Sequence, residues 1–350
     1  KKRFPLSWAL EGTRSRTGKL MPPRYGLISY VANAYIKDDN PELLIIPVSI
    51  VYDQVPEVAD YDALLQGKQK RAESSLWFAE YIKKLKRPHG RVHLKFGQGI
   101  ELKNYRSDPS AKKASPRDIQ KIAFDLAVDT NNATPITATS LICYVLLDHG
   151  HRALTRSELD RDIKRLLRFV ESFDFTRTDE VKALDEQTLD RYLQQLSATG
   201  IVEIITDGNE QVYRIPEGEG RKAAYYRNGL IHFFVDFAIG ELAMLSVTST
   251  GKQAYEDFCE KALYIRDMLK FEFFFEGSAE FLASLLNKMD AHIEGWREAL
   301  NEGPKAVRAT LRHRDLLIGH GSLRPFIEAY LLLSKSLYQL PQNEEVSEKD

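Results

Sequence analysis

A short basic segment, residues 11–19, holds the side chains of this sequence that are best suited to binding an anion. It reads Glu-Gly-Thr-Arg-Ser-Arg-Thr-Gly-Lys and follows the apolar run 4–10. Arg14 and Arg16 are two residues apart, so on an extended chain both guanidinium groups lie on the same side. Paired guanidinium groups bind a phosphate bidentately, and a nearby lysine adds a point charge. The segment predicts a phosphate site, and the alternative is a solvated basic turn after a strand.

The same segment resembles the third sequence block of the glycerol-3-phosphate acyltransferases, in which Glu-Gly precedes Arg-Ser-Arg and then Gly-Lys. Residues 45–53 resemble the fourth block of that family, a β-rich run with a proline. Residues 225–228, Tyr-Tyr-Arg-Asn, resemble a Tyr-Arg-Asn element in the C-terminal region of the large, membrane-bound bacterial and mitochondrial branch. The resemblance covers most of the chain up to about residue 240.

The resemblance implies a role in substrate binding for particular positions. Arg14 and Arg16 would hold the phosphate of glycerol 3-phosphate, with Lys19 as an auxiliary charge. Glu11 would bind the glycerol hydroxyl or orient an arginine, and Pro47 would shape the floor of the pocket. The substrate-binding residues implied in this way are Glu11, Gly12, Arg14, Ser15, Arg16, Gly18, Lys19 and Pro47.

The activity that the resemblance implies is acyl transfer from acyl-CoA or acyl-acyl carrier protein to the sn-1 hydroxyl of glycerol 3-phosphate. The product is lysophosphatidic acid, and this reaction is the first step of phospholipid synthesis. The resemblance implies no cofactor. The family resemblance also implies work at a membrane surface. The expected location is the cytoplasmic face of the cell (inner) membrane, or the mitochondrial outer membrane if the source is a eukaryote.

The catalytic signature of the family, a histidine followed five residues later by an aspartate, is missing from this sequence. None of the eight histidines has that spacing, and His232 has Asp236 one residue too close. We therefore assign no catalytic residue here and expect the chain to be the C-terminal portion of a longer enzyme, with the N-terminal half as its partner. The alternative is a non-catalytic adaptor or degenerate relative that binds protein or membrane through its helical C-terminal region.

Composition is of the soluble globular type, with 43% hydrophobic and 28% charged residues and a net charge of −1. The length of 350 residues allows two or three packed units. Residues 1–24 carry seven basic side chains and one acidic one, which suits an anionic substrate or a membrane surface. Cys143 and Cys259 are far apart and indicate neither a disulfide framework nor a zinc site, which favours a reducing setting.

Residues 1–103 are expected to form the C-terminal half of an α/β acyltransferase domain. The apolar run 4–10 predicts a buried strand, residues 25–35 a helix, and residues 43–52 a strand buried on both faces. This order predicts a crossover unit and a mixed or parallel sheet with flanking helices. Residues 11–19 and 53–57 follow the two strands, where a shared pocket could form.

Two further segments complete this expected domain. The alternation of residues 91–96 predicts a third strand. Residues 68–87 predict a basic amphipathic helix with aromatic side chains. Such a helix either covers the sheet or docks on an anionic bilayer or an acyl-carrier partner.

Residues 104–350 are expected to be mostly helical. Within them, residues 154–215 predict two helices and a hairpin, which resembles a winged-helix subdomain. Because the second helix is acidic, we expect a packing or interaction module and no nucleic-acid partner. The aromatic cluster 271–275 favours core packing over contact with lipid.

A polar stripe is expected on the apolar segment 230–247, which is too charged to be read as a membrane span. Asn228, His232 and Asp236 are four residues apart and would share one face of a helix. They either line a site or form the satisfied polar edge of a core helix, and the second interpretation is favoured.

Overall fold

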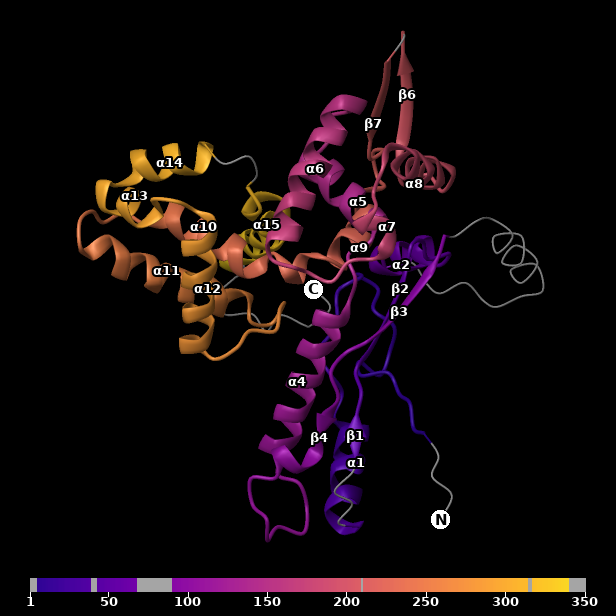
Figure 1. Cartoon of the computed structure of the whole chain (residues 1–350), viewed down its shortest axis with the longest axis vertical. Helices are drawn as coiled ribbons and strands as arrows, with labels where there is room; N and C mark the ends of the chain where they lie inside the picture. Colours follow the sequence, from indigo (N-terminus) through magenta and orange to yellow (C-terminus); the bar gives the residue numbers. More distant parts are fainter. Residues whose placement is uncertain (1–4, 39–42, 68–89, 209, 314–316, 340–350) are drawn as a thin grey trace, which may run out of the picture. The chain divides into compact units, whose positions relative to one another are not determined.

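The structure is a computed structural model that describes residues 5–38, 43–67, 90–208, 210–313 and 317–339 (Figure 1). The chain divides into two compact units. The first comprises Lys1–Phe233 with Glu272–Phe274, and the second comprises Phe234–Phe271 with Phe275–Asp350. The predicted domain boundary near residue 103 falls inside the first unit and stays a prediction. The predicted basic helix 68–87 lies outside the described residues.

The strands of the predicted acyltransferase part form two antiparallel ladders. β1 (Leu44–Ile45) pairs with β4 (Ile100–Glu101), and β2 (Val48–Tyr52) pairs with β3 (Val92–Phe96). The prediction of a third strand at 91–96 is confirmed. The prediction of a crossover between parallel strands is wrong for the described residues, because β2 finds its neighbour in an antiparallel strand later in the chain.

The first predicted strand does not form, since residues 5–9 have no regular secondary structure. The Arg24 amide donates a hydrogen bond to the Leu10 carbonyl oxygen at 2.9 Å, which holds the end of this run to the start of the next helix. Trp8 and Leu10 pack against the core, whereas Leu6 is exposed. The apolar pattern reflects contact with the core, which the sequence alone does not distinguish from strand pairing.

The second predicted strand forms as two short strands, β1 and β2, separated by Ile46 and Pro47. Its side chains alternate, with Ile45, Pro47 and Ser49 buried and the residues between them exposed. The prediction that both faces are buried is therefore wrong. One face lies against the rest of the unit, and the other is exposed in the part of the chain that the structure describes.

Two long helices pack against these ladders. α1 (Tyr25–Asp38) confirms the predicted helix at 25–35. α4 (Pro116–Ala133) begins at Ser115, whose hydroxyl accepts from the Asp118 amide in a capping box, with proline at the first helical position. The 3-10 helix Leu102–Tyr105 follows β4. The core here consists of Ile28, Ala32, Ile45, Ile100, Leu102, Ile122, Ala123 and Leu126.

The rest of the first unit is mainly helical, which confirms a mixed α/β chain with a helical C-terminal region. The elements are α2 (Val58–Leu65), α5 (Ala138–Asp148), β5 (Leu154–Thr155), α6 (Arg156–Ser172), α7 (Asp179–Lys182), α8 (Glu186–Ala198), β6 (Glu203–Asp207), β7 (Glu210–Arg214), α9 (Gly220–Asn228) and the 3-10 helix Ile231–Phe233. The predicted pair of helices and hairpin at 154–215 is present, and in Figure 1 the β6–β7 hairpin extends beyond α6 and α8. β5 was not predicted, and it adds a third strand to β7.

The second unit is built from helices among its described residues. They are α10 (Val235–Ser246), α11 (Gln253–Leu269), α12 (Ser278–His292), α13 (Trp296–Glu302), α14 (Pro304–Arg312) and α15 (Gly319–Gln339). α10 is the central one and packs against α11, α12, α14 and α15. A Cβ atom on Gly240 of α10 would lie 2.5 Å from the Met289 sulfur, so the glycine permits close approach of α12. Within the described ranges, none of the helices combines the length and apolarity that crossing a bilayer requires.

Candidate functional site

The basic loop 11–19 has a backbone that depends on its glycines. Gly12 and Gly18 have φ values of +67° and +76°, in the left-handed region that favours glycine. A Cβ atom on Gly18 would lie 1.8 Å from the carbonyl oxygen of Tyr225. The loop therefore passes directly against the backbone of α9, and only glycine fits at this crossing.

The side chains of α9 hold the loop in this position. Asn228 Nδ2 donates a hydrogen bond to the Thr17 carbonyl oxygen at 2.8 Å, and Arg227 Nη2 donates to Asn228 Oδ1 at 2.8 Å. Arg227 is buried, which lowers the pKa of its guanidinium. The Tyr226 hydroxyl accepts a hydrogen bond from the Val55 amide at 3.0 Å. Two segments that the sequence analysis singled out separately, the loop and Tyr-Tyr-Arg-Asn, are thus one structural assembly.

The two arginines of the loop are accessible. The side chain of Arg14 is 81% exposed, and its Nη1 lies 3.7 Å from Glu57 Oε1. A hydrogen bond with Tyr61 and the charge of Glu57 raise the pKa of Arg14. Arg16 is exposed and makes no side-chain hydrogen bond or ion pair with the described residues. Both guanidinium groups can therefore reach an anion without leaving a buried partner.

Lys19 is oriented differently from the arginines. Its side chain is only 15% exposed and forms an ion pair with Glu272. Its Nζ lies 4.9 Å from the centroid of the Phe273 ring, in a cation–π contact. Burial lowers the pKa of Lys19, while Glu272 opposes that shift. Lys19 ties the loop to residues 272–274, and its predicted role as an auxiliary phosphate ligand stays a prediction.

The remaining predicted site residues mostly support the loop. Glu11 Oε1 accepts a hydrogen bond from the Met21 amide at 2.5 Å, and burial raises the pKa of this carboxyl. Ser15 Oγ donates to the Lys19 carbonyl oxygen at 2.7 Å. Pro47 is buried, and no hydrogen bond among the described residues joins it to the loop. Its place beside the substrate stays a prediction.

A buried carboxylate at the end of β2 links distant segments. Asp53 is 1% exposed and accepts hydrogen bonds from the Arg91 amide at 2.8 Å, from His93 Nε2 at 3.1 Å and from the Tyr192 hydroxyl at 3.0 Å. The last bond joins β2 to α8 across 139 residues of sequence. Asp53 therefore fixes the strand that precedes Glu57. The sequence analysis did not predict this network, because nothing in the sequence links an aspartate to a tyrosine so far away.

The expected polar stripe does not form. α9 ends at Asn228, and His232 lies in a separate 3-10 helix, so Asn228, His232 and Asp236 do not share one helical face. The ring of His232 is buried with Nε2 2.9 Å from the Asn131 carbonyl oxygen, and burial lowers its pKa to about 4. His232 is thus a neutral, hydrogen-bonded core residue, as the favoured interpretation expected, but the shared helical edge that this interpretation assumed is absent. Asp236 forms an ion pair with Lys288.

Three phenylalanines of the aromatic cluster 271–275 pack as favoured, whereas Phe271 is 80% exposed. Phe273 is buried beneath Lys19, and the rings of Phe274 and Phe124 lie 6.1 Å apart. Phe275 packs edge-on against Phe281 at 5.5 Å.

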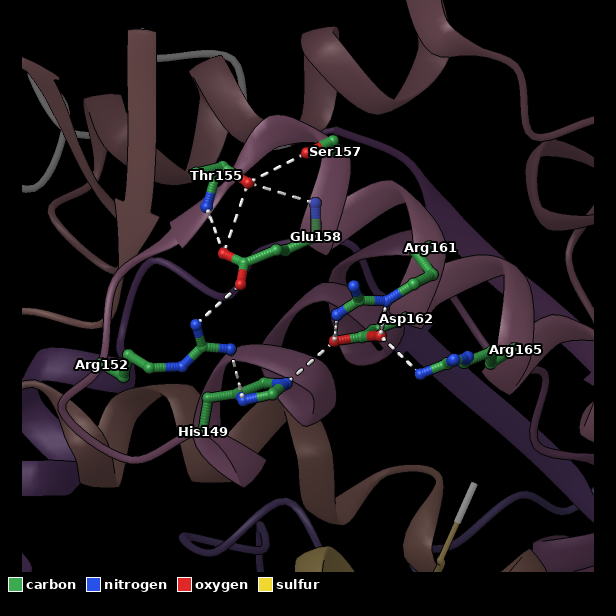
Figure 2. A network of polar contacts seen from close by, with 8 residues as sticks. All are labelled: His149, Arg152, Thr155, Ser157, Glu158, Arg161, Asp162 and Arg165. Carbon is green, nitrogen blue, oxygen red and sulfur yellow. Dashed lines mark hydrogen bonds and ion pairs between the residues drawn. The ribbon is translucent and has the colours of Figure 1, made fainter. Parts of the chain in front are cut away.

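Figure 2 shows a second polar cluster, at the start of α6. His149 Nε2 lies 3.0 Å from Asp162 Oδ2, and Arg152 Nη2 lies 3.2 Å from His149 Nδ1. Arg152 also pairs with Glu158 at 2.8 Å and holds the pKa of that carboxyl at about 2. Glu158 in turn accepts from the Thr155 amide in the capping box of α6. Each charged group is partnered within a helix-capping network, so we assign this cluster a structural role.

Comparison with known proteins finds one matching family model and several similar proteins. Residues 61–350 match the model of the glycerol-3-phosphate acyltransferase C-terminal region. Proteins of Mycobacterium bovis and Mycobacterium tuberculosis named "Putative acyltransferase plsB1" are 33% identical over 336 residues, which cover 95% of this chain and 54% of theirs. The "Glycerol-3-phosphate acyltransferase" of Pseudoalteromonas translucida is 27% identical over 344 residues, covering 91% of this chain and 42% of its own length. The chain therefore spans about half the length of these relatives.

Proposed function

Because the chain belongs to the family of the glycerol-3-phosphate acyltransferase C-terminal region, we propose that it forms the phosphate-binding part of a glycerol-3-phosphate 1-O-acyltransferase. The reaction moves an acyl group from acyl-CoA or acyl-acyl carrier protein to the sn-1 hydroxyl of glycerol 3-phosphate and yields lysophosphatidic acid. The observation that carries this proposal is the loop 11–19, whose two arginines are accessible while α9 holds its backbone in place.

The arginines would contact the substrate phosphate directly. A guanidinium fork donates two parallel hydrogen bonds to phosphate oxygens, and the charges attract the dianion. Arg14 keeps its charge at any working pH, because Tyr61 and Glu57 raise its pKa further. Glu57 competes weakly for Arg14, since the pair is 3.7 Å apart and the arginine is exposed.

Glu11 and Lys19 would act next to the phosphate. One carboxylate oxygen of Glu11 accepts from the Met21 amide, which leaves the other oxygen to accept from a glycerol hydroxyl. Lys19 shares its charge with Glu272, so its contribution to phosphate binding is smaller than that of an unpaired lysine. Pro47 would contribute shape only.

The proposed chemical step requires the histidine of a His-x-x-x-x-Asp block, and this sequence does not contain that block. In the proposed reaction the glycerol hydroxyl oxygen attacks the thioester carbonyl, its proton passes to a histidine of a His-x-x-x-x-Asp block, and the thiol leaves with that proton. The block would come from the N-terminal half of the enzyme. The residues of this chain bind and orient the substrate, which raises the effective concentration of its hydroxyl at the base.

The remaining parts of the proposal concern location and partners. We propose that the enzyme works at the cytoplasmic face of the cell membrane, or at the mitochondrial outer membrane in a eukaryote, where its product is released. Residues 154–215 would serve as a winged-helix-like packing module, because Tyr192 of α8 binds Asp53 of the strand region and not a surface ligand.

The complete product of the gene that encodes this chain provides the test. It is supplied with glycerol 3-phosphate and either palmitoyl-CoA or palmitoyl-acyl carrier protein, and the products are identified by mass spectrometry. We expect 1-acyl-lysophosphatidic acid from at least one donor. Absence of acylated product with both donors, or acylation of the sn-2 hydroxyl, would contradict the proposal.

A further inference from the structure

One face of the β2–β3 ladder is apolar and exposed. Six residues, paired directly across the two antiparallel strands, share this face, and we call them the ladder face: Val48 with Phe96, Ile50 with Leu94, and Tyr52 with Val92. In the part of the chain that the structure describes, the exposed fraction of each of these six residues is between 39% and 65%. Such a contiguous apolar patch on a strand pair marks an interaction surface.

The opposite face of the same ladder is the more polar one. Ser49 is buried with its Oγ 2.8 Å from Thr134 Oγ1, at the end of α4. His93 is directed toward the buried Asp53. A sheet with one solvated face normally turns its polar side chains outward. In this ladder the apolar side chains lie on the outer face instead, which suits that face to contact with an apolar surface.

We propose that the ladder face is the docking surface for the part of the enzyme that lies outside the region matched in its relatives. The 336 matched residues make up 54% of the mycobacterial proteins, so nearly half of those chains lies elsewhere. The matched family is a C-terminal region, from which we infer that the remainder lies on the N-terminal side. The identity of this partner rests on the proposed function, whereas the apolar face does not.

A polypeptide fits this surface better than a lipid bilayer does. Among the described residues β2 and β3 form a sheet of two strands, and such a sheet is marginal unless more strands or a helix complete it. The backbone groups at its open edges would be satisfied by another strand, which lipid chains cannot replace. The ladder face also contains no lysine or arginine, whereas interfacial membrane-binding faces carry basic residues beside the apolar ones.

Docking at the ladder face would place the partner against the first unit, which also contains the basic loop. Glu57, the neighbour of Arg14, follows β2 by only a few residues, and Asp53 and Val55 between them are held by Tyr192 and Tyr226. These bonds therefore fix the position of the end of β2 relative to α9 and the loop. A segment seated on β2 and β3 would be aligned with the phosphate site by these bonds.

Binding of this chain to a separately produced fragment tests the proposal without any assay of activity. The fragment is the N-terminal portion of the complete gene product that the proposed function requires. Affinity is measured by calorimetry, and backbone hydrogen exchange of β2 and β3 is measured with and without the fragment. The test variants are Ile50→Lys and Leu94→Lys, with Ile50→Ser and Leu94→Ser in reserve if a lysine variant does not fold. The control is Tyr264→Lys on α11, since Tyr264 is 69% exposed and belongs to the second unit.

We expect a saturable complex, slower hydrogen exchange in β2 and β3, and a Kd that rises at least about tenfold in each test variant. Tyr264→Lys should bind like the wild type, and Arg14→Ala should dock normally even where it abolishes substrate binding. The proposal is overturned if no complex forms or if the ladder variants bind the fragment unchanged. It is equally overturned if those variants instead abolish self-association of this chain or its binding to phosphatidylglycerol vesicles while leaving fragment binding intact.

Discussion

Asn228 Nδ2 lies 2.8 Å from the carbonyl oxygen of Thr17, although 211 residues separate the two in sequence. This bond makes the helical part of the first unit responsible for the shape of the basic loop. Arg227 strengthens the arrangement because its Nη2 donates to Asn228 Oδ1 and so fixes the orientation of the side-chain amide. A substitution in α9 should therefore change substrate binding by the basic loop, although α9 is distant from that loop in sequence.

Asn228→Ala should raise the KM for glycerol 3-phosphate with little change in kcat. One hydrogen bond contributes about 0.5–1.5 kcal/mol, which corresponds to a roughly 2- to 12-fold effect. Steady-state kinetics with the complete gene product measure it. Asn33→Ala is the matched control, because Asn33 Oδ1 accepts from the Ala114 amide at 2.9 Å and not from a residue of the loop. Equal effects of the two substitutions on KM would mean that Asn228 has no special role in substrate binding.

Gly18→Ala should be much more harmful than Gly150→Ala. Both glycines have positive φ, so an alanine costs about 1–2 kcal/mol at either position. Only at Gly18 would the new Cβ meet backbone, 1.8 Å from the Tyr225 oxygen, whereas nothing lies within 4 Å of it at Gly150. Urea unfolding of the two variants should separate these effects. Similar losses of stability would show that the loop does not press against α9.

Tyr192→Phe should destabilise the first unit. The substitution removes a donor from the buried carboxylate of Asp53, and hydrogen bonds to charged groups contribute about 1.5–3 kcal/mol. Ser172→Ala removes a bond to the neutral Phe169 carbonyl oxygen and should cost about 1 kcal/mol or less. Thermal unfolding followed by circular dichroism compares the two. If Tyr192→Phe melts like the wild type, α8 is not anchored through Asp53.

His232 should make the protein less stable in mild acid. Its pKa is lowered to about 4 by burial, against about 6.5 in an unfolded chain. Between these pH values the unfolded state binds more protons, so stability falls as the pH drops from about 6.5 toward 4. The slope from this one group is at most about 1.4 kcal/mol per pH unit.

His232→Gln removes this titration and keeps a donor for the Asn131 carbonyl oxygen. Urea unfolding at pH 7.5, 6.5 and 5.5 should therefore show a shallower pH dependence in His232→Gln than in the wild type. The control His151→Gln, at an exposed position, should keep the wild-type slope. An NMR titration of the His232 ring with a midpoint near 6.5 would refute the buried, neutral assignment.

The basic loop could be predicted from residue types and spacing, because anion binding depends on local groups: two arginines, a lysine and flanking glycines. Its supports could not be predicted. Glu272 is 253 residues from Lys19, and its contact depends on how residues 272–274 pack against the loop. The same holds for Tyr192 and Asp53. Contacts over such separations arise from tertiary packing, which carries no local sequence pattern.

The strands show a different limit. Residues 43–52 are apolar at nearly every position, which predicts burial on both faces. The apolar pattern indicates that both faces of the strand are covered, but it does not indicate which polypeptide covers them. The described residues cover only the face toward Ser49, and Ile50 on the other face stays exposed. The error in predicted burial thus coincides with the surface that we propose as a docking site.

The KM for glycerol 3-phosphate of Arg14→Ala and Arg16→Ala, measured in the complete gene product, tests the central claim most directly. Each substitution removes a charge-assisted contact worth about 1.5–3 kcal/mol, so kcat/KM should fall roughly 10- to 150-fold, mostly through KM. Arg117→Ala, an exposed arginine on α4, should be neutral. If both loop variants keep the KM of the wild type and of Arg117→Ala, the loop does not bind the phosphate and the account fails.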